Sequence, residues 1–386
     1  MPTQQQNSRR YYIKTYGCQM NVADSTKLAA VLESAGYLPT PNSELADLIL
    51  INTCVVRQNA EDRAAWYITS AKGLKKDNPS LKIGICGCLV TEPGRDLKKM
   101  FPHVDFFIPP NSPEKLAELL KPLTPMSSSP LLRGKRIGDG GNFVSIMTGC
   151  DNYCSYCVVP YVRGRETSRP MDEVLAEIKG LLEQGVTDIT LLGQNVNSYG
   201  PGFAKLLKAI SPLVPGTGYQ VPVIRFMTSH PKDMSDEIIE AVAELPYVAK
   251  DIHLPLQSGD DDILKQMNRG YTVEYFKGRV AKIRSLLPNA RISTDLMVGF
   301  PGETEEQFEY SIKLVKEIGF TQVNMFAYSG RPETAAAKME GQVPEEVKQA
   351  RLQRLIEVNR ETLGNRDVSA EGGSAYGGQS QVSKAI

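Results

Sequence analysis

The chain has no run of about 18 apolar residues, the length that a helix needs to cross a bilayer, so we expect no membrane span. It opens with Met1-Pro2-Thr3-Gln4-Gln5-Gln6, which contains no apolar signal-peptide core. We therefore expect a reducing, cytoplasmic compartment. There, clustered cysteines are more often metal ligands or catalysts than disulfide partners.

An excess of charge of either sign is also missing, because 44 Lys and Arg balance 44 Asp and Glu. This balance argues against a globally basic nucleic-acid binder and leaves only a local basic patch open. The length of 386 residues and the 41% hydrophobic content fit a soluble enzyme of about two or three domains.

Residues 1–120 alternate short apolar runs with amphipathic stretches, which predicts an N-terminal α/β domain with a parallel sheet. The expected strands are 11–16, 48–52, 82–86 and 105–108. The expected helices are 23–35, 60–74 and 112–120. Residues 121–142 are rich in Pro, Ser and Gly, which predicts a linker.

The alternation restarts over residues 143–343 with a longer period. The expected strands lie near 143–148, 187–192, 222–228, 250–255, 291–298 and 321–328. These strand–helix units predict an incomplete (β/α)6 barrel with its chemistry at the carboxyl ends of the strands. A doubly wound open sheet is the structural alternative. Residues 344–365 are expected to form a C-terminal helix, and residues 366–386 a flexible tail without a core.

Cys150, Cys154 and Cys157 form a C-x3-C-x2-C pattern directly after an apolar run. Three thiolates on one loop can hold three irons of a cubane iron–sulfur cluster and leave the fourth iron open to a ligand. Structural zinc is the competing interpretation, but zinc needs four ligands. None of the histidines, at positions 103, 230 and 253, lies close in sequence to supply the fourth.

Three other cysteines each follow an expected strand: Cys18 the first, Cys54 the second and Cys88 the third. In a parallel sheet all three reach the same carboxyl edge, where ligands and cofactors collect. They predict a second three-thiolate site. Cys86 is expected on the same sheet face as Cys88 and is an alternative ligand. The alternative interpretation of each of these cysteines is that it packs as a small hydrophobic residue in the core and binds no metal.

The segment Cys150-Asp151-Asn152-Tyr153-Cys154-Ser155-Tyr156-Cys157 resembles the signature of the radical S-adenosylmethionine superfamily. The stretch 149–169 narrows the resemblance to the methylthiotransferases. Thr15-Tyr16-Gly17-Cys18 and Asn52-Thr53-Cys54 are similar to the amino-terminal domain of that family. Leu191-Leu192-Gly193-Gln194-Asn195 is similar to the bacterial enzymes that methylthiolate prenylated adenosine in tRNA. The resemblance covers about residues 10–360.

The resemblance implies two 4Fe-4S clusters, one on Cys150, Cys154 and Cys157 that binds S-adenosylmethionine, and an auxiliary one on Cys18, Cys54 and Cys88. It implies a transferase that adds a methylthio group to C2 of N6-isopentenyladenosine at position 37 of tRNA. The implied partners are tRNA carrying prenylated adenosine and a reductant protein such as flavodoxin or ferredoxin. The alternatives are an enzyme of the same chemistry acting on another modified adenosine or a protein side chain, and a non-catalytic iron–sulfur or zinc protein.

Further roles are expected at the strand ends and beside the cysteines. The expected contacts to S-adenosylmethionine are Tyr156, Ser229, Gln257 and Asp295. The expected contacts to cofactor carboxylate or tRNA phosphate are Arg163, Arg165 and Arg169. The candidates for substrate contact are Gln194 and Asn195. Family members usually carry a small C-terminal β-barrel that grips tRNA, and we expect it to be absent after residue 365.

Overall fold

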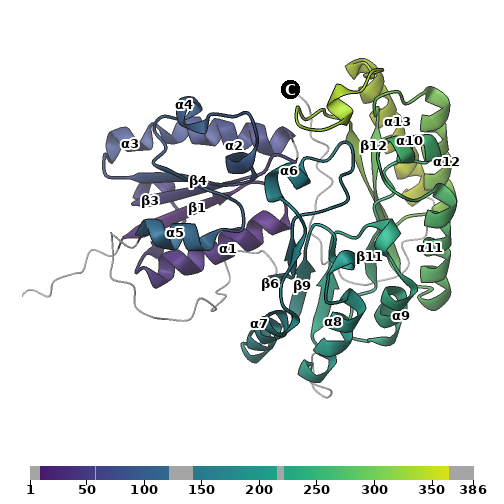
Figure 1. The fold of residues 1–386 in the computed structure, drawn as a ribbon, viewed down its shortest axis with the longest axis horizontal. Coiled ribbons are helices and arrows are strands. Elements are labelled where there is room, and N and C mark those ends of the chain that lie inside the picture. Colours follow the sequence, from purple (N-terminus) through teal and green to yellow (C-terminus); the bar gives the residue numbers. More distant parts are fainter. Residues whose placement is uncertain (1–8, 57, 121–141, 215–220, 365–386) are drawn as a thin grey trace, which may run out of the picture.

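The computed structural model describes residues 9–56, 58–120, 142–214 and 221–364. Two α/β units lie beside each other, one formed by the N-terminal third of the chain and one by the rest (Figure 1). The expected tail at 366–386 and the expected linker at 121–142 lie outside the described residues, except for Asn142, which begins a strand. Among the described residues, no helix is both long and apolar enough to span a membrane.

The N-terminal unit contains a five-stranded parallel sheet with the order β2-β1-β3-β4-β5. Its strands are β1 (Arg10–Thr15), β2 (Leu38–Pro39), β3 (Leu48–Thr53), β4 (Lys82–Gly87) and β5 (Phe106–Ile108). The strand order changes direction between β1 and β3, which makes this sheet doubly wound. The gap between the carboxyl ends of β1 and β3 is the position where such sheets bind ligands.

Helices cover both faces of this sheet (Figure 1). They are α1 (Gln19–Ser34), α2 (Gln58–Ala71), α3 (Leu74–Asp77), α4 (Leu97–Met100) and α5 (Pro113–Leu120). Alternate residues of β3 enter different cores: Leu48 and Leu50 pack with α1 and α5, whereas Ile49 and Ile51 pack with α2. This burial on both faces explains why the sequence of β3 is continuously apolar. The four expected strands and three expected helices are present, and the two-residue β2 was not expected.

The second unit contains six parallel strands in two three-stranded sheets, β6-β9-β10 and β11-β12-β13. They are β6 (Asn142–Ser145), β9 (Asp188–Leu192), β10 (Val223–Phe226), β11 (Asp251–His253), β12 (Arg291–Val298) and β13 (Gln322–Ala327). A parallel bridge between Ile224 and Val248 joins the two sheets. Because the strand order follows the sequence without reversal, the sheet is wound in one direction only. The structure thus confirms the partial barrel and contradicts the doubly wound alternative for this unit.

The barrel helices lie outside the strands (Figure 1). They are α7 (Met171–Glu183), α8 (Phe203–Ile210), α9 (Asp236–Glu244), α10 (Asp261–Gln266), α11 (Val273–Leu286), α12 (Glu305–Ile318) and α13 (Glu345–Gly364). The last of these confirms the expected C-terminal helix. An unexpected antiparallel pair, β7 (Met147–Thr148) and β8 (Thr167–Ser168), brackets the loop that carries the C-x3-C-x2-C pattern and the short helix α6 (Val159–Arg163).

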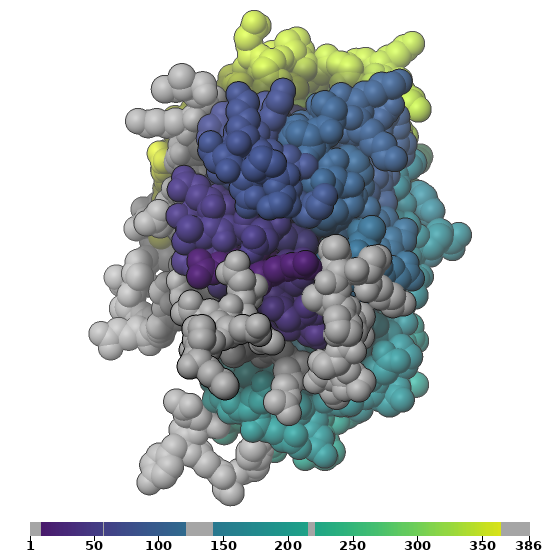
Figure 2. Space-filling view, turned by 90° about the vertical axis from the view of Figure 1, so that its left-hand side faces the viewer, coloured from purple at the N-terminus to yellow at the C-terminus, as the bar shows by residue number. Residues whose placement is uncertain are grey.

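Two apolar contacts hold the units together. Met20 and Ala23 of α1 pack against Leu192 at the end of β9. Val158 and Val162, at α6, join the core that contains Leu89 of the N-terminal unit. In the space-filling view, turned by 90°, the N-terminal unit therefore stands in front of the barrel (Figure 2). The carboxyl edge of the first sheet and the carboxyl ends of the barrel strands thus face each other.

Candidate functional site

The cysteines at positions 18, 54 and 88, here called the N-terminal cysteines, follow three neighbouring strands of the first sheet. Cys18 is the N-cap residue of α1 after β1, Cys54 follows β3, and Cys88 begins the turn η2 (Cys88–Thr91) after β4. Cys54 and Cys88 are buried, whereas Cys18 is exposed. The positive end of the α1 dipole next to Cys18 favours negative charge at this position.

Two glycines allow the loops that carry these cysteines to approach closely. At Gly17, whose φ is 124°, an added Cβ would lie 2.4 Å from Cβ of Cys54. At Gly87, whose φ is 92°, an added Cβ would lie 2.4 Å from Oδ1 of Asn52. Real Cβ contacts are longer, so both positions require glycine. The loops after β1, β3 and β4 therefore meet at the carboxyl edge, as the sequence predicted.

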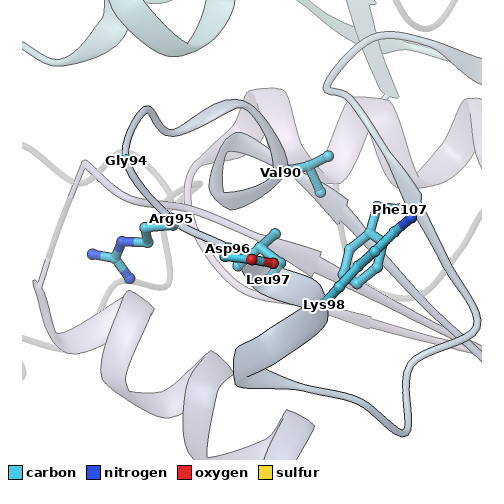
Figure 3. A pocket seen from close by; sticks show the side chains of 7 residues that line it. All are labelled: Val90, Gly94, Arg95, Asp96, Leu97, Lys98 and Phe107. Carbon is cyan, nitrogen blue, oxygen red and sulfur yellow. The ribbon is translucent and has the colours of Figure 1, made fainter.

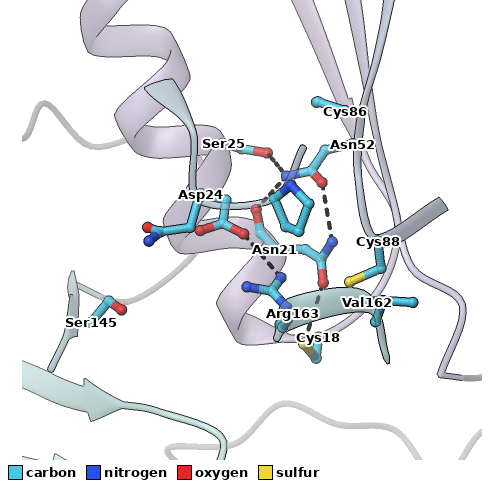
Figure 4. Close-up of polar contacts among 12 residues, drawn as sticks. Cys18, Asn21, Asp24, Ser25, Asn52, Cys86, Cys88, Ser145, Val162 and Arg163 are labelled. Carbon is cyan, nitrogen blue, oxygen red and sulfur yellow. Dashed lines mark hydrogen bonds and ion pairs between the residues drawn. The ribbon is translucent and has the colours of Figure 1, made fainter. Parts of the chain in front are cut away.

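A buried network of side-chain amides fixes this edge (Figure 4). Nδ2 of Asn21 donates to Oδ1 of Asn52 at 3.1 Å and to the carbonyl of Thr53 at 2.8 Å. Nδ2 of Asn52 donates to Oγ of Ser25 at 2.9 Å. The thiol of Cys18 donates to Oδ1 of Asn21 at 3.3 Å. Asn21 thus connects the first of the N-terminal cysteines to the end of β3.

Cys86 does not share a face with Cys88, contrary to the expectation. Cys86 packs in the core under α1 and α5, whereas Cys88 packs in the other core with Val158 and Val162. The physical reason is Gly87, whose positive φ ends β4 and turns the chain before Cys88. Burial raises the pKa of the Cys86 thiol, which keeps it neutral. The structure gives Cys86 the surroundings of a small core residue.

Arg163, at the end of α6, reaches from the barrel unit to the N-terminal cysteines. Its Nη2 atom lies 2.9 Å from Oδ2 of Asp24 on α1, and both side chains are almost fully buried. Next to this ion pair, Oγ1 of Thr91 donates to the carbonyl of Val162 at 2.6 Å. The expected contact of Arg163 with tRNA phosphate is wrong because this guanidinium is buried between the units. Figure 4 shows it turned toward Asp24, with Cys18 and Cys88 nearby.

The thiol of Cys88 is held in its neutral form in this structure. Burial raises its pKa to about 12, and the charge of Arg163 opposes that shift, while Cys54 and Cys18 add to it. A metal that binds buried thiols displaces their protons, so burial makes binding dependent on pH but does not prevent it.

The cysteines at positions 150, 154 and 157, here called the loop cysteines, lie in the segment between β7 and β8. The amide of Cys157 donates to the carbonyl of Cys154 at 2.9 Å, and the amide of Cys150 donates to the carbonyl of Gly164 at 3.3 Å. Nδ2 of Asn268 donates to the carbonyl of Tyr153 at 3.0 Å. Burial raises the pKa of Cys157 to about 12 and also raises that of Cys150. The loop is therefore fixed by backbone contacts.

Arg269 is a buried cation beside the loop cysteines that the sequence analysis missed. Its Nη1 atom donates to Sγ of Cys154 at 3.4 Å and to the hydroxyl of Tyr156 at 3.3 Å. Its Nη2 atom donates to the carbonyl of Pro255 at 2.8 Å, and its Nε atom to the hydroxyl of Tyr271. Arg269 follows α10 rather than a strand, so the strand-end rule gives no signal for it.

Several buried polar atoms at the strand ends of the barrel have no hydrogen-bond partner among the described residues. These atoms are Oε1 of Gln194, Oδ1 of Asn195, Oγ of Ser229, Nε2 of His230 and Oε1 of Gln257. An unpaired buried polar atom costs about 1–3 kcal/mol, so this group fits a ligand rich in polar atoms. Thr228 and Gln257 have positive φ values of 72° and 75°, which is strained for side chains other than glycine and typical of ligand sites.

The other expected contacts have partners within the chain. Asp295 accepts from Nδ2 of Asn324 at 2.9 Å, and its Oδ2 atom lies 3.4 Å from Nε2 of His253. Tyr156 packs beside Phe300 as well as contacting Arg269. His230, considered in the sequence as a distant zinc ligand, lies in the loop after β10. Burial, Arg269 and Lys232 together lower its pKa to about 2, so its imidazole is neutral.

The remaining two arginines are also paired with carboxylates. Arg165 lies 2.8 Å from Asp151, and its side chain is 77% exposed. Arg169 donates to Glu177 at 2.6 Å and to the carbonyl of Ser145 at 2.7 Å. Arg169 therefore holds the end of β6, and its expected contact with a cofactor carboxylate or tRNA phosphate stays a prediction. Arg165 alone of the three presents its guanidinium to solvent.

The donor sets fit clusters better than single metal ions. Among the described residues, no three His, Cys, Asp or Glu side chains are placed to hold one metal ion. In a cubane cluster each thiolate binds a different iron, so three thiolates around a cluster need not converge on one point. Two groups of three cysteines have the donor chemistry of clusters with an open iron, and Cys86, the one further cysteine near them in sequence, packs in a separate core.

A separate hollow of about 450 Å³ lies on the N-terminal unit (Figure 3). It is lined by Val90, Gly94, Arg95, Asp96, Leu97, Lys98 and Phe107. Neither group of cysteines contributes a side chain to it. The hollow is therefore distinct from the candidate site.

Comparisons with known proteins agree with this arrangement. Residues 144–315 match the Radical SAM superfamily, and residues 10–109 match the family described as Uncharacterized protein family UPF0004. The chain is 44% identical over 382 residues to the tRNA-2-methylthio-N(6)-dimethylallyladenosine synthase of Clostridium botulinum strain Hall, with 94% of this chain and 84% of the relative covered. It is 41% identical to the synthase of the same name from Geotalea uraniireducens, with 95% and 89% covered.

Among solved structures, the chain resembles the radical S-adenosylmethionine methyltransferase TsrM of Kitasatospora setae, determined with cobalamin and a [4Fe-4S] cluster bound. The TM-score is 0.65 at 15% identity, with 86% of this chain and 77% of that chain covered, so the likeness concerns the fold alone. The relatives found by sequence, at 41% and 44% identity, therefore decide the family to which the chain belongs. The chain belongs to the radical SAM superfamily and, within it, to the tRNA-2-methylthio-N(6)-dimethylallyladenosine synthase family of transferases.

Proposed function

We propose that this enzyme adds a methylthio group to C2 of N6-isopentenyladenosine at position 37 of tRNA. The names of its relatives support the substrate. The observation that carries the proposal is the convergence of two groups of three cysteines on one junction between the units. A reaction that inserts sulfur and also makes a radical needs two such sites.

In this proposal the loop cysteines hold the 4Fe-4S cluster that binds S-adenosylmethionine, and the N-terminal cysteines hold a second 4Fe-4S cluster. When bound, these groups supply an adenosyl radical and the sulfur to be transferred. The protein holds the reacting groups and excludes water. The unpaired polar atoms of Ser229 and Gln257 are suited to hold the polar groups of S-adenosylmethionine, with Tyr156 and Asp295 beside them.

Helix α6 connects the loop cysteines to the N-terminal cysteines at the junction between the two units. α6 begins two residues after Cys157 and ends at Arg163, which contacts Asp24 next to the N-terminal cysteines. The five residues of α6 span about 7.5 Å in helical geometry. Val158, which follows Cys157, packs in the same core as Cys88, so this short segment connects the two groups of cysteines. Gln194 and Asn195, whose side-chain oxygens lie unpaired near this junction, are the proposed contacts to the substrate.

The proposal requires tRNA and an electron donor as partners. We propose Arg165 as a phosphate contact because its side chain is 77% exposed and reaches solvent beside the loop cysteines. A reductant protein such as flavodoxin or ferredoxin fits the electron requirement of a radical S-adenosylmethionine enzyme.

The deciding experiment is mass analysis of nucleosides from prenylated tRNA after anaerobic incubation with the reconstituted enzyme, S-adenosylmethionine and reductant. A methylthio product on the prenylated adenosine is expected, together with deoxyadenosine. If deoxyadenosine forms without the methylthio product, the substrate would be another modified adenosine or a protein side chain. Neither product from a chain that contains iron and sulfide would indicate a non-catalytic iron–sulfur protein.

A further inference from the structure

Arg163 is a buried cation with one nitrogen unused. Its side chain is 3% exposed, and its Nη2 atom pairs with Asp24 at 2.9 Å. Its Nη1 atom is buried and has no hydrogen-bond partner among the described residues. A guanidinium seldom leaves a buried N–H unpaired, because this costs about 1–3 kcal/mol or more for a charged group. The free N–H therefore indicates that something else accepts its hydrogen bond.

The surroundings of Arg163 show what that acceptor is. Figure 4 shows the guanidinium turned toward Asp24, with the side chains of Cys18 and Cys88 nearby. Burial acts against its charge, but Cys88, Asp24 and Cys18 together raise the pKa of Arg163. Lys27 on α1 also interacts with the charges of Asp24 and Arg163, and burial lowers its pKa. Apart from Asp24, whose Oδ1 atom is also unpaired, the groups that raise the pKa of Arg163 are therefore the thiols of Cys88 and Cys18.

We propose that Arg163 is a positioning residue for the second cluster, which donates its free N–H to the sulfur atoms held at Cys18 and Cys88 and stabilises their negative charge. This inference depends on the proposed function, which places a cluster on the N-terminal cysteines. Hydrogen bonds and positive charge at cluster sulfurs stabilise the more negative, reduced state and so raise the reduction potential. Arg163 belongs to the barrel unit, whereas the N-terminal cysteines belong to the other unit. The reduction potential of the second cluster therefore depends on the contact between the two units.

The test measures a potential rather than activity. The full chain with Cys150, Cys154 and Cys157 replaced by alanine retains the N-terminal cysteines and the core residue Cys86, so after anaerobic reconstitution it should hold about four irons. A redox titration followed by electron paramagnetic resonance then reports the second cluster alone. In this background Arg163→Gln should make the potential more negative. Arg163→Lys, which keeps the charge but loses the second N–H, should shift it in the same direction by less.

The variant Asp24→Asn distinguishes a direct effect of the Arg163 charge on the reduction potential from an effect of damage to the interface between the units. Arg163→Gln and Asp24→Asn break the same ion pair, so damage to the interface would shift both potentials in the same direction. Direct action of the charges predicts opposite shifts, with Asp24→Asn less negative than the parent. Arg351→Gln is the matched control, because Arg351 is an equally buried arginine paired with a carboxylate away from the cysteines. It should leave the potential unchanged.

Shifts in the same direction, no shift, or loss of iron in both Arg163 variants would overturn the inference. In each of these cases Arg163 would serve only to hold the two units together. An absence of iron in the parent chain with the three alanines would have a different meaning. It would refute the second cluster itself and with it the proposed function.

Discussion

The loop cysteines lie in one short segment between β7 and β8, whereas the N-terminal cysteines come from the loops after three separate strands. A buried arginine accompanies each group. Arg269 contacts Cys154 from within the barrel unit, and Arg163 reaches the N-terminal cysteines from the other unit. The first site is complete within one unit, but the second is assembled where two units meet.

Because one site lies within a single unit and the other lies between two units, the two sites depend on different parts of the structure. The loop cysteines need only the hairpin around them and the segment at Asn268 and Arg269. The N-terminal cysteines need the order of β1, β3 and β4, the tight turn at Gly87 and the contact with α6. Changes at the interface should therefore act on the second site and spare the first.

The largest effect is expected from Cys88→Ala compared with Cys86→Ala. Cys88→Ala should reduce bound iron from about eight to about four atoms per chain and abolish the methylthio product, because one cluster loses a ligand. Cys86→Ala should keep both, since Cys86 is 1% exposed in a separate core. Iron and sulfide analysis with nucleoside mass spectrometry checks this. Equal iron loss in both variants would mean that Cys86 is a ligand.

Arg269→Gln should act on the first site alone. The variant removes the donor to Sγ of Cys154 and to the hydroxyl of Tyr156, whereas the carbonyl of Pro255 keeps the hydroxyl of Tyr271 as a donor. If these two contacts, of about 1–1.5 kcal/mol each, stabilise the reacting state, their loss corresponds to a roughly hundredfold lower rate of deoxyadenosine release. Arg269→Lys should recover part of that rate. Iron in the chain that lacks the loop cysteines should not change, and a loss there would contradict the independence of the two sites.

Arg331→Gln should affect the junction between the units. Arg331, after β13, pairs at 2.7 Å with Glu61 on α2, and both side chains are buried. Removing one partner of a buried pair typically costs about 3–5 kcal/mol. Because only the second site depends on the interface, we expect the ratio of methylthio product to deoxyadenosine to fall about tenfold. Denaturant unfolding and quantification of both products measure the two effects.

Arg225→Gln is the matched control for that experiment. Arg225 pairs with Asp188 at 3.0 Å and with Asp251 at 2.8 Å within the barrel. The variant should lower the free energy of unfolding while the product ratio stays at its original value. A ratio that falls equally in both variants would show that general loss of stability, and not the interface, explains the result.

The sequence was sufficient for the strands and for the loop cysteines, because both are local patterns. Continuous apolar runs such as β3 mark strands buried on both faces, and a cysteine triplet in one loop needs no tertiary information. The convergence of the N-terminal cysteines was also predictable, since strand ends in a parallel sheet share an edge.

The remaining features depend on contacts that sequence spacing does not encode. The face of Cys88 depends on the positive φ of Gly87, which breaks the alternation expected for a strand. The roles of Arg163 and Arg269 depend on which distant groups they meet, here Asp24 and Cys154. The pairing of β7 with β8 involves only two residues in each strand, too few for a periodic pattern.

The smallest effect concerns a buried carboxylate away from both groups of cysteines. Burial raises the pKa of Glu303 from 4.5 to about 7, although the amide of Gly299 and the charge of Arg351 oppose this shift. Between these two pH values the folded chain holds a proton that the unfolded chain has released, so the free energy of unfolding falls as the pH rises. The decrease attributable to Glu303 is on the order of 3 kcal/mol.

Glu303→Gln should therefore flatten the dependence of stability on pH, measured by denaturant unfolding at about pH 5 and about pH 7.5. Glu305→Gln is the control, because the side chain of Glu305 is 61% exposed and should leave the slope in place. The same slope in wild type and Glu303→Gln would show that Glu303 stays ionised throughout. Both variants should keep their full iron content, because Glu303 connects the loop after β12 to α13 and supports neither group of cysteines.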